Sequence, residues 1–226
     1  MNPSSATKRS AMLKVAIVDQ QRVFADALVY RLQNEVDFEV VCSTADTTQA
    51  CAAVIDSRPH VVVLDAELSD GSAFEIAGRI RHDLMWTKVL FLTQGASDTL
   101  IEHALRLNAD GIVSRDEPLL QLIQAIRRSA AGERTFSPAI HSRICFDPAR
   151  RRFRFRVDPP THSLTDRQLE ILRLVARGET ARAVAEKLRI TSKAVDNQRQ
   201  RIMEKLGVSD KVSLALYAVR EGLIKP

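Results

Sequence analysis

Short apolar runs and amphipathic segments alternate along the first 135 residues of the chain. Each run is followed by a segment with helical spacing, such as Val23, Ala27, Leu28 and Leu32 after the first. Uninterrupted apolar runs are typical of parallel strands that are covered on both faces. The pattern predicts an α/β fold with a doubly wound five-stranded parallel sheet. The five strand-length runs are 15–18, 38–42, 61–64, 89–92 and 112–113.

The last third of the chain has the pattern of a small all-α module with four helices. Thr165 and Gln168 have the spacing of a capping box, and Gly178 ends the helix that follows them. Three further helices are expected over 181–188, 192–206 and 210–221. A helix, a tight turn and a second helix with an exposed polar face are typical of a helix-turn-helix. That motif places its second helix in the major groove of DNA.

The outward face of the 192–206 helix carries the candidate DNA-binding residues. Val195, Ile202 and Leu206 form its inward stripe, and capping residues stand at its start. A helical module for protein interaction is the alternative interpretation of this pattern. The residues assigned to DNA are Thr191, Ser192, Lys193, Asp196, Asn197, Arg199, Gln200, Arg201 and Lys205.

Charge is distributed unequally along the chain. Residues 13–135 carry 12 Lys and Arg against 18 Asp and Glu, whereas residues 161–226 carry 13 against 8. A basic second half is suited to double-stranded DNA as a partner. Residues 136–160 contain four prolines, and six arginines against two aspartates, so we expect a basic linker there. Arg and Phe alternate over 150–157, which fits a solvated linker, one short edge strand or an extended arm along DNA phosphates.

The first residues of the chain and its three cysteines indicate in which cellular compartment the protein is expected. Residues 1–12 are small and polar, and no apolar run follows that is long enough for a signal or a membrane span. We therefore expect a disordered tail and no membrane partner. Cys42, Cys51 and Cys145 are irregularly spaced, which argues against a disulfide framework or a zinc site. A reducing cytoplasm suits such a chain.

Polar residues stand where the expected strands end. Asp19 follows the first strand, Asp65 the third, Thr93 the fourth and Arg115 the fifth. In strand order 2-1-3-4-5 the two aspartates face each other at the switch point, where doubly wound sheets bind ligands. The pair is suited to Mg²⁺, and an Asp oxygen beside that ion can attack a phosphoryl group. Thr93 would donate to the phosphoryl group and Arg115 would neutralise it. Turn residues after strands are the alternative interpretation of the aspartates.

Residues 13–141 resemble the receiver domains of two-component response regulators. The stretches that carry the resemblance are LKVAIVDQQ, VVVLDAELSDGSAFEIA, VLFLTQG and ADGIVSRDEPLLQLIQAIRRSAAG. The resemblance implies that Asp65 is the phosphoacceptor, that Asp19 belongs to an acidic metal pocket and that Thr93 is the switch hydroxyl. It also implies a sensor histidine kinase as a partner.

The receiver resemblance is incomplete. Gln20 stands where the family has a second acid, which should weaken Mg²⁺ binding, and Arg115 replaces the usual Lys. Glu67 would restore the missing charge if its loop turned inward; a solvated Glu is the alternative. Two versions of this domain follow. Asp65 is phosphorylated slowly or with altered metal dependence, or the domain is a degenerate receiver that serves as a dimerisation and input platform.

Residues 164–224 are similar to the helix-turn-helix domains of the LuxR and NarL type. The similarity covers LTDRQLEILRLVARGETARAVAEKLRITSKAVDNQRQRIMEKLGV and LALYAVREGLI. It implies that Asp196, Asn197 and Gln200 face the bases and that the last helix contributes to a dimer. Asp196 occupies a position where the family usually has Lys, so we expect an unusual operator. The implied phosphate contacts are Lys193, Arg199, Arg201 and Lys205.

The sequence as a whole predicts a cytoplasmic, homodimeric transcription regulator of two-component type. Beyond phosphotransfer at Asp65, we expect no enzymatic activity and no catalytic residues. The alternative is an interaction protein that titrates other regulators without specific DNA binding. The expected parts are a tail over 1–12, a receiver-like domain over 13–135, a basic linker over 136–160 and a helix-turn-helix domain over 161–226.

Overall fold

The computed structural model describes residues 12–70 and 72–224, so the expected tail lies outside the described residues except for Met12. The chain forms two compact units. Among the described residues, the first contains those up to residue 94 and residues 104–141, and the second contains residues 95–103 and those from 142 onward. None of the helices within the described ranges has the length and hydrophobicity that a membrane crossing requires.

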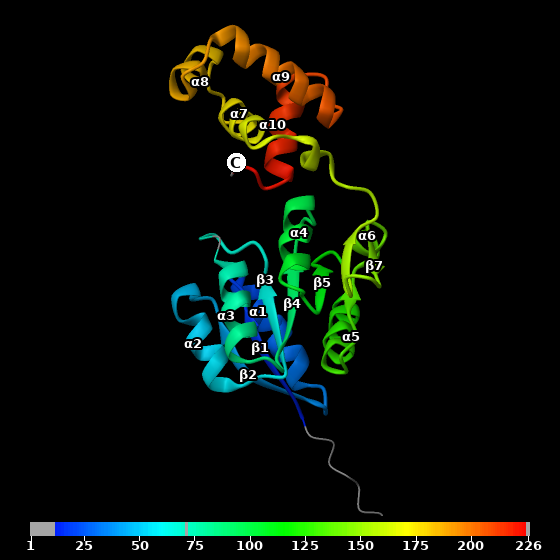
Figure 1. Ribbon diagram of the computed structural model, residues 1–226. Helices are drawn as coiled ribbons and strands as arrows, with labels where there is room; N and C mark the ends of the chain where they lie inside the picture. The colour runs from blue at the N-terminus through cyan, green and yellow to red at the C-terminus, as the bar shows by residue number, and fades with distance from the viewer. Residues whose placement is uncertain (1–11, 71, 225–226) are drawn as a thin grey trace, which may run out of the picture. The chain divides into compact units, whose positions relative to one another are not determined.

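Strands and helices alternate through the part of the chain that precedes residue 142 (Figure 1). The five expected strands are all present, with bounds that differ by a few residues from the apolar runs. The elements in chain order are β1 (Leu13–Val18), α1 (Arg22–Gln33), β2 (Phe38–Thr44), α2 (Thr47–Ser57), β3 (Val61–Asp65), α3 (Ala73–Asp83), β4 (Lys88–Thr93), α4 (Asp98–Arg106), β5 (Gly111–Ser114), α5 (Leu119–Ala130), β6 (Thr135–Phe136) and α6 (Pro138–His141).

The sheet has six strands in the order β2-β1-β3-β4-β5-β6, and all its pairs are parallel. The expected number of five was therefore wrong. The sixth strand, β6, has only two residues and no apolar run, so the hydrophobic pattern does not reveal it. It pairs with β5 because Gly111 allows a close approach: a Cβ at Gly111 would lie 2.6 Å from the Thr135 carbonyl oxygen.

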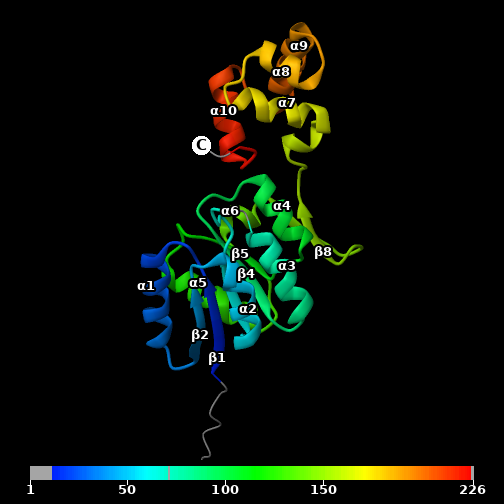
Figure 2. The same ribbon diagram turned by 90° about the vertical axis from the view of Figure 1, so that its left-hand side faces the viewer.

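Helices cover both faces of this sheet, which explains the uninterrupted apolar strands. Figure 2 shows α1 on one side of the strands and α3 on the other. Leu28 and Leu32 of α1 pack in one buried cluster with Ile123 and Ile126 of α5 and with alternate residues of the central strands. On the other face, the rings of Phe74 in α3 and Phe91 in β4 lie 5.1 Å apart.

The second unit contains a short hairpin and a bundle of helices. Part of the expected basic linker, residues 144–155, is folded here into a two-stranded antiparallel hairpin, β7 (Ile144–Asp147) and β8 (Arg152–Phe155). A 3-10 turn, η1 (Pro160–Ser163), leads from the hairpin to the helices. These are α7 (Asp166–Ala176), α8 (Ala181–Leu188), α9 (Ser192–Leu206) and α10 (Lys211–Arg220).

The ends of these helices are fixed by the signals that the sequence predicts. Thr165 and Gln168 form the capping box of α7, with both reciprocal hydrogen bonds present. Thr191 caps α9 by accepting a hydrogen bond from the backbone N–H of Ala194 at 3.1 Å. Gly207 ends α9 in the left-handed region, with φ 67°. Val195 and Ile202 of α9 are fully buried in the core that the four helices share. The helix-turn-helix pattern is therefore confirmed as a packed module.

Candidate DNA-binding surface and acidic pocket

The two strand-end aspartates lie together as the strand order predicts. In the parallel pair of β1 and β3, Val18 is opposite Leu64, so Asp19 and Asp65 extend from neighbouring positions at the carboxyl edge of the sheet. Both residues are almost completely buried, with exposed fractions of 1% and 3%. Two carboxylates in this position require a cation or strong hydrogen-bond donors close by.

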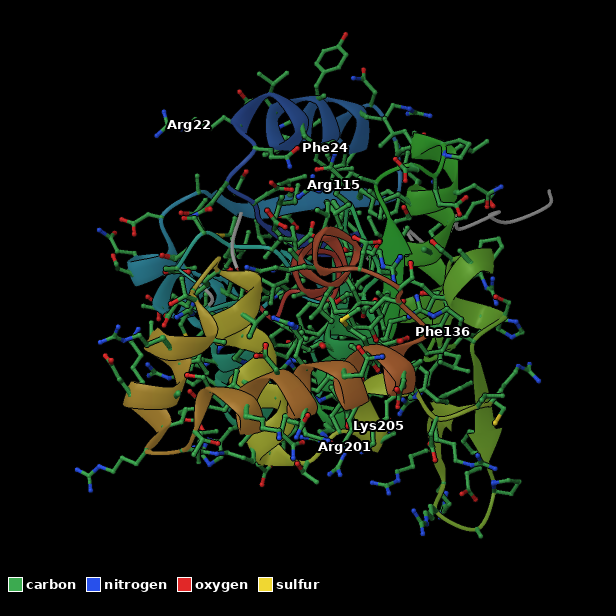
Figure 3. All side chains as sticks on the ribbon, turned by 90° about the horizontal axis from the view of Figure 1, so that it is seen from above. Arg22, Phe24, Arg115, Phe136, Arg201 and Lys205 are labelled. Carbon is green, nitrogen blue, oxygen red and sulfur yellow. The ribbon has the colours of Figure 1, made fainter. Side chains whose placement is uncertain are left out.

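Arg115 supplies that cation. It follows β5, and its Nη2 lies 2.7 Å from Oδ2 of Asp19 and 3.2 Å from Oδ2 of Asp65. The Phe24 ring of α1 covers the guanidinium at 4.6 Å, and Figure 3 shows these two side chains next to each other. Only 7% of the Arg115 side chain is exposed. The guanidinium therefore occupies the acidic pocket itself and does not extend from it toward solvent.

Arg115 is incompletely satisfied in this position. Its Nε and Nη1 are buried and have no hydrogen-bond partner among the described residues. Burial also raises the pKa of the Asp19 carboxyl, although the Gln21 N–H and the Arg115 guanidinium act in the opposite direction. Each carboxylate thus has one charge-assisted contact from Arg115 and one hydrogen bond from a backbone N–H, that of Gln21 for Asp19 and that of Glu67 for Asp65.

The side chains of Gln20 and Glu67, two further residues expected near the pocket, accept hydrogen bonds from backbone N–H groups. The Gln20 side-chain oxygen accepts a hydrogen bond from the backbone N–H of Ser69 at 2.8 Å. The Glu67 carboxylate is exposed and accepts a hydrogen bond from the backbone N–H of Gln94, also at 2.8 Å. Thr93 is fully buried at the end of β4. Glu67 therefore closes a loop contact in this structure, and the acidic pocket contains Asp19 and Asp65.

The residues of the pocket do not fit a magnesium ion as they are arranged. Within residues 12–70 and 72–224, no group of three or more His, Cys, Asp or Glu side chains comes together to hold a metal. Mg²⁺ requires near-octahedral oxygen ligands. Here Nη2 of the Arg115 guanidinium lies 2.7 Å from Oδ2 of Asp19 and 3.2 Å from Oδ2 of Asp65. Arg115 and a divalent ion would compete for the same two carboxylates.

The other candidate surface is the exposed face of α9. Of the residues assigned to DNA, all are exposed except Arg199, which is partly exposed. Figure 3 shows Arg201 and Lys205 on this helix. The helix follows α8 after a turn in which Arg189 adopts a left-handed backbone, with φ 54°. These features give α9 the geometry of the second helix of a helix-turn-helix, with an exposed polar face.

Two side-chain contacts within α9 involve residues that the sequence resemblance expects to face the bases. Oδ1 of Asp196 lies 3.0 Å from Nη2 of Arg199, an ion pair between residues three positions apart. The Asp196 charge is therefore partly neutralised before any DNA approaches. The side chain of Gln200 donates to Glu204 at 3.2 Å, so this amide also has a partner within the helix.

Lys205 and Gln168 have a structural role that the sequence pattern does not indicate. The Lys205 ammonium donates to the carbonyl oxygen of Ser163 at 2.6 Å and to Oε1 of Gln168 at 2.8 Å. The Gln168 amide nitrogen in turn donates to Gln198 at 3.1 Å. Gln168 is 6% exposed and links α7 to α9, while Lys205 links α9 to η1. Its place in the capping box was the only sequence signal for this role.

Comparison with known proteins relates both units to regulators. The model of the response regulator receiver domain matches residues 15–127, and that of the bacterial regulatory proteins of the luxR family matches residues 162–218. The oxygen regulatory protein NreC of Staphylococcus aureus (strain MRSA252) is 30% identical over 216 residues, which are 94% of this chain and 100% of that protein. NreC of Staphylococcus epidermidis (strain ATCC 12228 / FDA PCI 1200) is 30% identical over 217 residues, with the same coverage.

Solved structures share the fold at lower identity. RcsB from Salmonella enterica serovar Typhimurium, bound to promoter rprA in the presence of the phosphomimetic BeF3⁻, is 22% identical with a TM-score of 0.61. The match covers 91% of this chain and 97% of that one. Two RcsB dimers bound to two parallel DNAs give 20% identity and a TM-score of 0.65, with coverage of 92% and 98%. At these identities the comparison shows the fold.

Proposed function

The chain belongs to the response regulators that join a receiver domain to a LuxR-type DNA-binding domain, and we propose that it regulates transcription by binding duplex DNA as a dimer. We propose further that its receiver works without a phosphoryl group on Asp65, because Arg115 supplies the positive charge in the acidic pocket. The observation that carries the first proposal is the exposed, capped α9 beside α8. The observation that carries the second is the position of Arg115 between Asp19 and Asp65.

DNA recognition follows from the side chains that α9 presents. Asn197 and Gln200 carry amides suited to the bidentate recognition of adenine, while Lys193 and Arg201 suit phosphates. One small helix-turn-helix makes too few contacts for specific affinity, so paired half-sites and a dimer are expected. Lys205 stabilises the position of η1 beside α9, because its ammonium donates a hydrogen bond to the carbonyl oxygen of Ser163. Binding to chromosomal DNA implies a cytoplasmic location.

The receiver proposal rests on charge compensation. Receiver domains as a family use Mg²⁺ for phosphorylation, and a divalent ion supplies charge that lets an Asp accept a phosphoryl group. In this chain the guanidinium of Arg115 balances the same carboxylates, and its side chain is almost completely buried. An incoming phosphoryl group would first have to displace Arg115 from Asp65. The domain then serves as a dimerisation and input platform, with or without a sensor histidine kinase.

Genome-wide selection of bound fragments tests the DNA proposal. The full-length protein is incubated with sheared genomic DNA, with and without acetyl phosphate and Mg²⁺, and the retained fragments are sequenced. We expect the same enriched sites in both conditions. Asn197→Ala with Arg201→Gln should abolish enrichment, whereas Arg173→Gln on the exposed side of α7 should preserve it. Enrichment of no fragment, together with capture of another regulator, would favour the titrating function instead.

Intact-mass measurement tests the receiver proposal separately. After incubation with acetyl phosphate and Mg²⁺, we expect no phosphoryl adduct on the wild-type chain. An adduct that is present in the wild type and absent from Asp65→Asn would contradict a phosphate-independent receiver. The DNA proposal would be unaffected by that result.

A further inference from the structure

The hairpin of the second unit has a charge pattern that the proposed function does not use. We call residues 144–157 the arginine hairpin. It contains five arginines and one carboxylate, Asp147, which leaves a net charge of +4. The five arginines, all exposed, are Arg150, Arg151, Arg152, Arg154 and Arg156.

The two faces of the arginine hairpin differ in chemistry. In the strand register Ile144 is opposite Phe155 and Phe146 is opposite Phe153, so one face is apolar. Ile144 and Phe155 are buried, and the rings of Phe146 and Phe153 form an edge-to-face pair at 5.4 Å. Side chains alternate between the faces of a strand. The other face is therefore the one that carries the arginines at alternate positions of β8.

Asp147 shapes the hairpin turn. Its Oδ1 accepts hydrogen bonds from the backbone N–H groups of Ala149 at 3.0 Å and Arg150 at 3.2 Å. Its other oxygen lies 3.5 Å from Nε of Arg154, the one arginine of the hairpin with an ion pair among the residues described by the structure. Four arginines are thus held near one another on a short folded element without carboxylate partners. Such repulsion is tolerated where a polyanion is the intended partner.

Contacts within the second unit connect the arginine hairpin to the DNA-binding helices. The Phe155 ring packs against the His162 ring of η1, edge to face, with centroids 6.2 Å apart. The carbonyl oxygen of the next residue of η1, Ser163, accepts a hydrogen bond from the Lys205 ammonium of α9. Within the second unit, the hairpin is therefore connected through η1 to the helix that carries the residues expected to face the bases.

We propose that the arginine hairpin is a second DNA-contact element, which binds the phosphate backbone next to the site that α9 reads. This inference rests on the proposed DNA-binding function and adds to it a contact without base specificity. The hairpin increases affinity for all sequences equally, because guanidinium groups pair with phosphate oxygens and not with base edges. Neutralised phosphates release counterions, so the contact appears in the salt dependence of binding.

The test compares salt slopes of the full-length chain. Fluorescence anisotropy measures affinity for a short duplex of mixed sequence and for one fragment enriched by the wild type, between about 50 and 200 mM KCl. The variant R150Q/R152Q/R156Q keeps Arg151, whose backbone is left-handed, and Arg154, which forms an ion pair with Asp147. We expect the slope of log affinity against log salt to become shallower by about 0.9 per lost contact, up to about 2.7. The change should be the same on both duplexes.

Two controls make the result specific. R22Q/R79Q/R128Q removes the same charge from exposed positions of the first unit and should leave the slope unchanged. R150K/R152K/R156K keeps the charge and should retain most of the wild-type slope. An unchanged slope in the folded glutamine variant, or an equal loss in the R22Q/R79Q/R128Q control, would overturn the inference. A wild-type chain that binds neither duplex would instead contradict the proposed function.

Discussion

Nη2 of Arg115 lies 2.7 Å from Oδ2 of Asp19, and the two side chains are 7% and 1% exposed. They come from positions 96 residues apart, after β5 and after β1. The same nitrogen lies 3.2 Å from Asp65, the residue whose family resemblance implies phosphorylation. One permanent cation therefore lies against both carboxylates of the acidic pocket.

Replacement of Arg115 by Ala should lower the stability of the protein and make that stability depend on Mg²⁺. Asp19 and Asp65 would become neighbouring buried carboxylates without a cation, and loss of one partner of a buried pair costs about 3–5 kcal/mol of stability. We expect added Mg²⁺ to restore more stability to Arg115→Ala than it adds to the wild type, because ligands stabilise the state they bind. Urea unfolding with and without Mg²⁺ measures this, with the exposed Arg79→Ala as control. An equal response of both proteins to Mg²⁺ would contradict the proposed role of Arg115.

Asp196→Asn should strengthen nonspecific DNA binding by releasing Arg199. The pair lies on an exposed helix face, so its loss should barely change stability. A free Arg199 can reach phosphate, and the salt slope should become steeper by about 0.9. The control Glu204→Gln removes the same charge from α9 without freeing an arginine. Anisotropy titrations that give identical slopes for the two variants would show that Arg199 does not contact phosphate.

Gly111→Ala should destabilise the first unit, and Gly78→Ala should not. A Cβ at Gly111 would collide with Leu90 and lie 2.5 Å from Oγ1 of Thr135, whereas one at Gly78 meets only Leu107 at 3.9 Å. Overpacking costs about 1–3 kcal/mol, while Ala in place of a helical Gly adds about 0.5–1 kcal/mol. Opposite shifts in thermal midpoint are therefore expected. A neutral Gly111→Ala would mean that β6 moves away without cost.

Tyr217→Phe should stabilise the helical unit. The Tyr217 hydroxyl is buried and has no hydrogen-bond partner among the described residues, and burial raises the pKa of Tyr217 to about 12. Removing an unsatisfied buried hydroxyl should add about 1 kcal/mol to the free energy of unfolding. Tyr30→Phe is the matched control, since Tyr30 is 71% exposed and should show no change. A loss of stability in Tyr217→Phe would reveal a partner for the hydroxyl in solution.

Arg127 should make stability depend on pH in the acid range. Its Nε lies 2.8 Å from Asp37 and its Nη2 2.8 Å from Glu35, and these hydrogen bonds hold the pKa values of both carboxyls below their ordinary values of 3.8 and 4.5. A lowered pKa in the folded state contributes stability above the ordinary value, which is lost as pH falls through the folded value. Arg127→Gln should therefore be less stable than wild type at about pH 7 and equal to it at about pH 2.

The control for this pH dependence is Arg128→Gln. Arg128 is the next residue on α5, and among the residues that the structure describes it pairs with Glu133, at a site where both side chains are more than half exposed. Its replacement should leave the acid-range profile close to that of the wild type. A stability deficit of Arg127→Gln that persists at about pH 2 would mean that Arg127 acts through packing on the Phe38 ring, which lies 4.9 Å from its guanidinium.

The elements that could be predicted from the sequence are those with a strong local signal. The β3 strand is a run of four apolar residues, and α7 begins at a capping box, so both follow from neighbours along the chain. The β6 strand has two residues, and its pairing depends on the missing side chain of Gly111. The hairpin partner of β8 is the four-residue Ile144–Asp147, which is too short for a clear alternation. The β6 pairing thus depends on a contact between segments distant along the chain, whereas β7 is local but too short to give a periodic signal.

The sequence by itself determined which residues stand at the ends of the strands and on the outer face of α9, because period and capping are local properties. Only the tertiary structure decided what those residues do to one another. It placed Arg115 between Asp19 and Asp65. It also paired the Glu67 carboxylate with the backbone N–H of Gln94 and the Lys205 ammonium with the carbonyl oxygen of Ser163. The physical reason is that the strength of a charge depends on its burial and on the nearest opposite charge. Both are set when distant segments pack together.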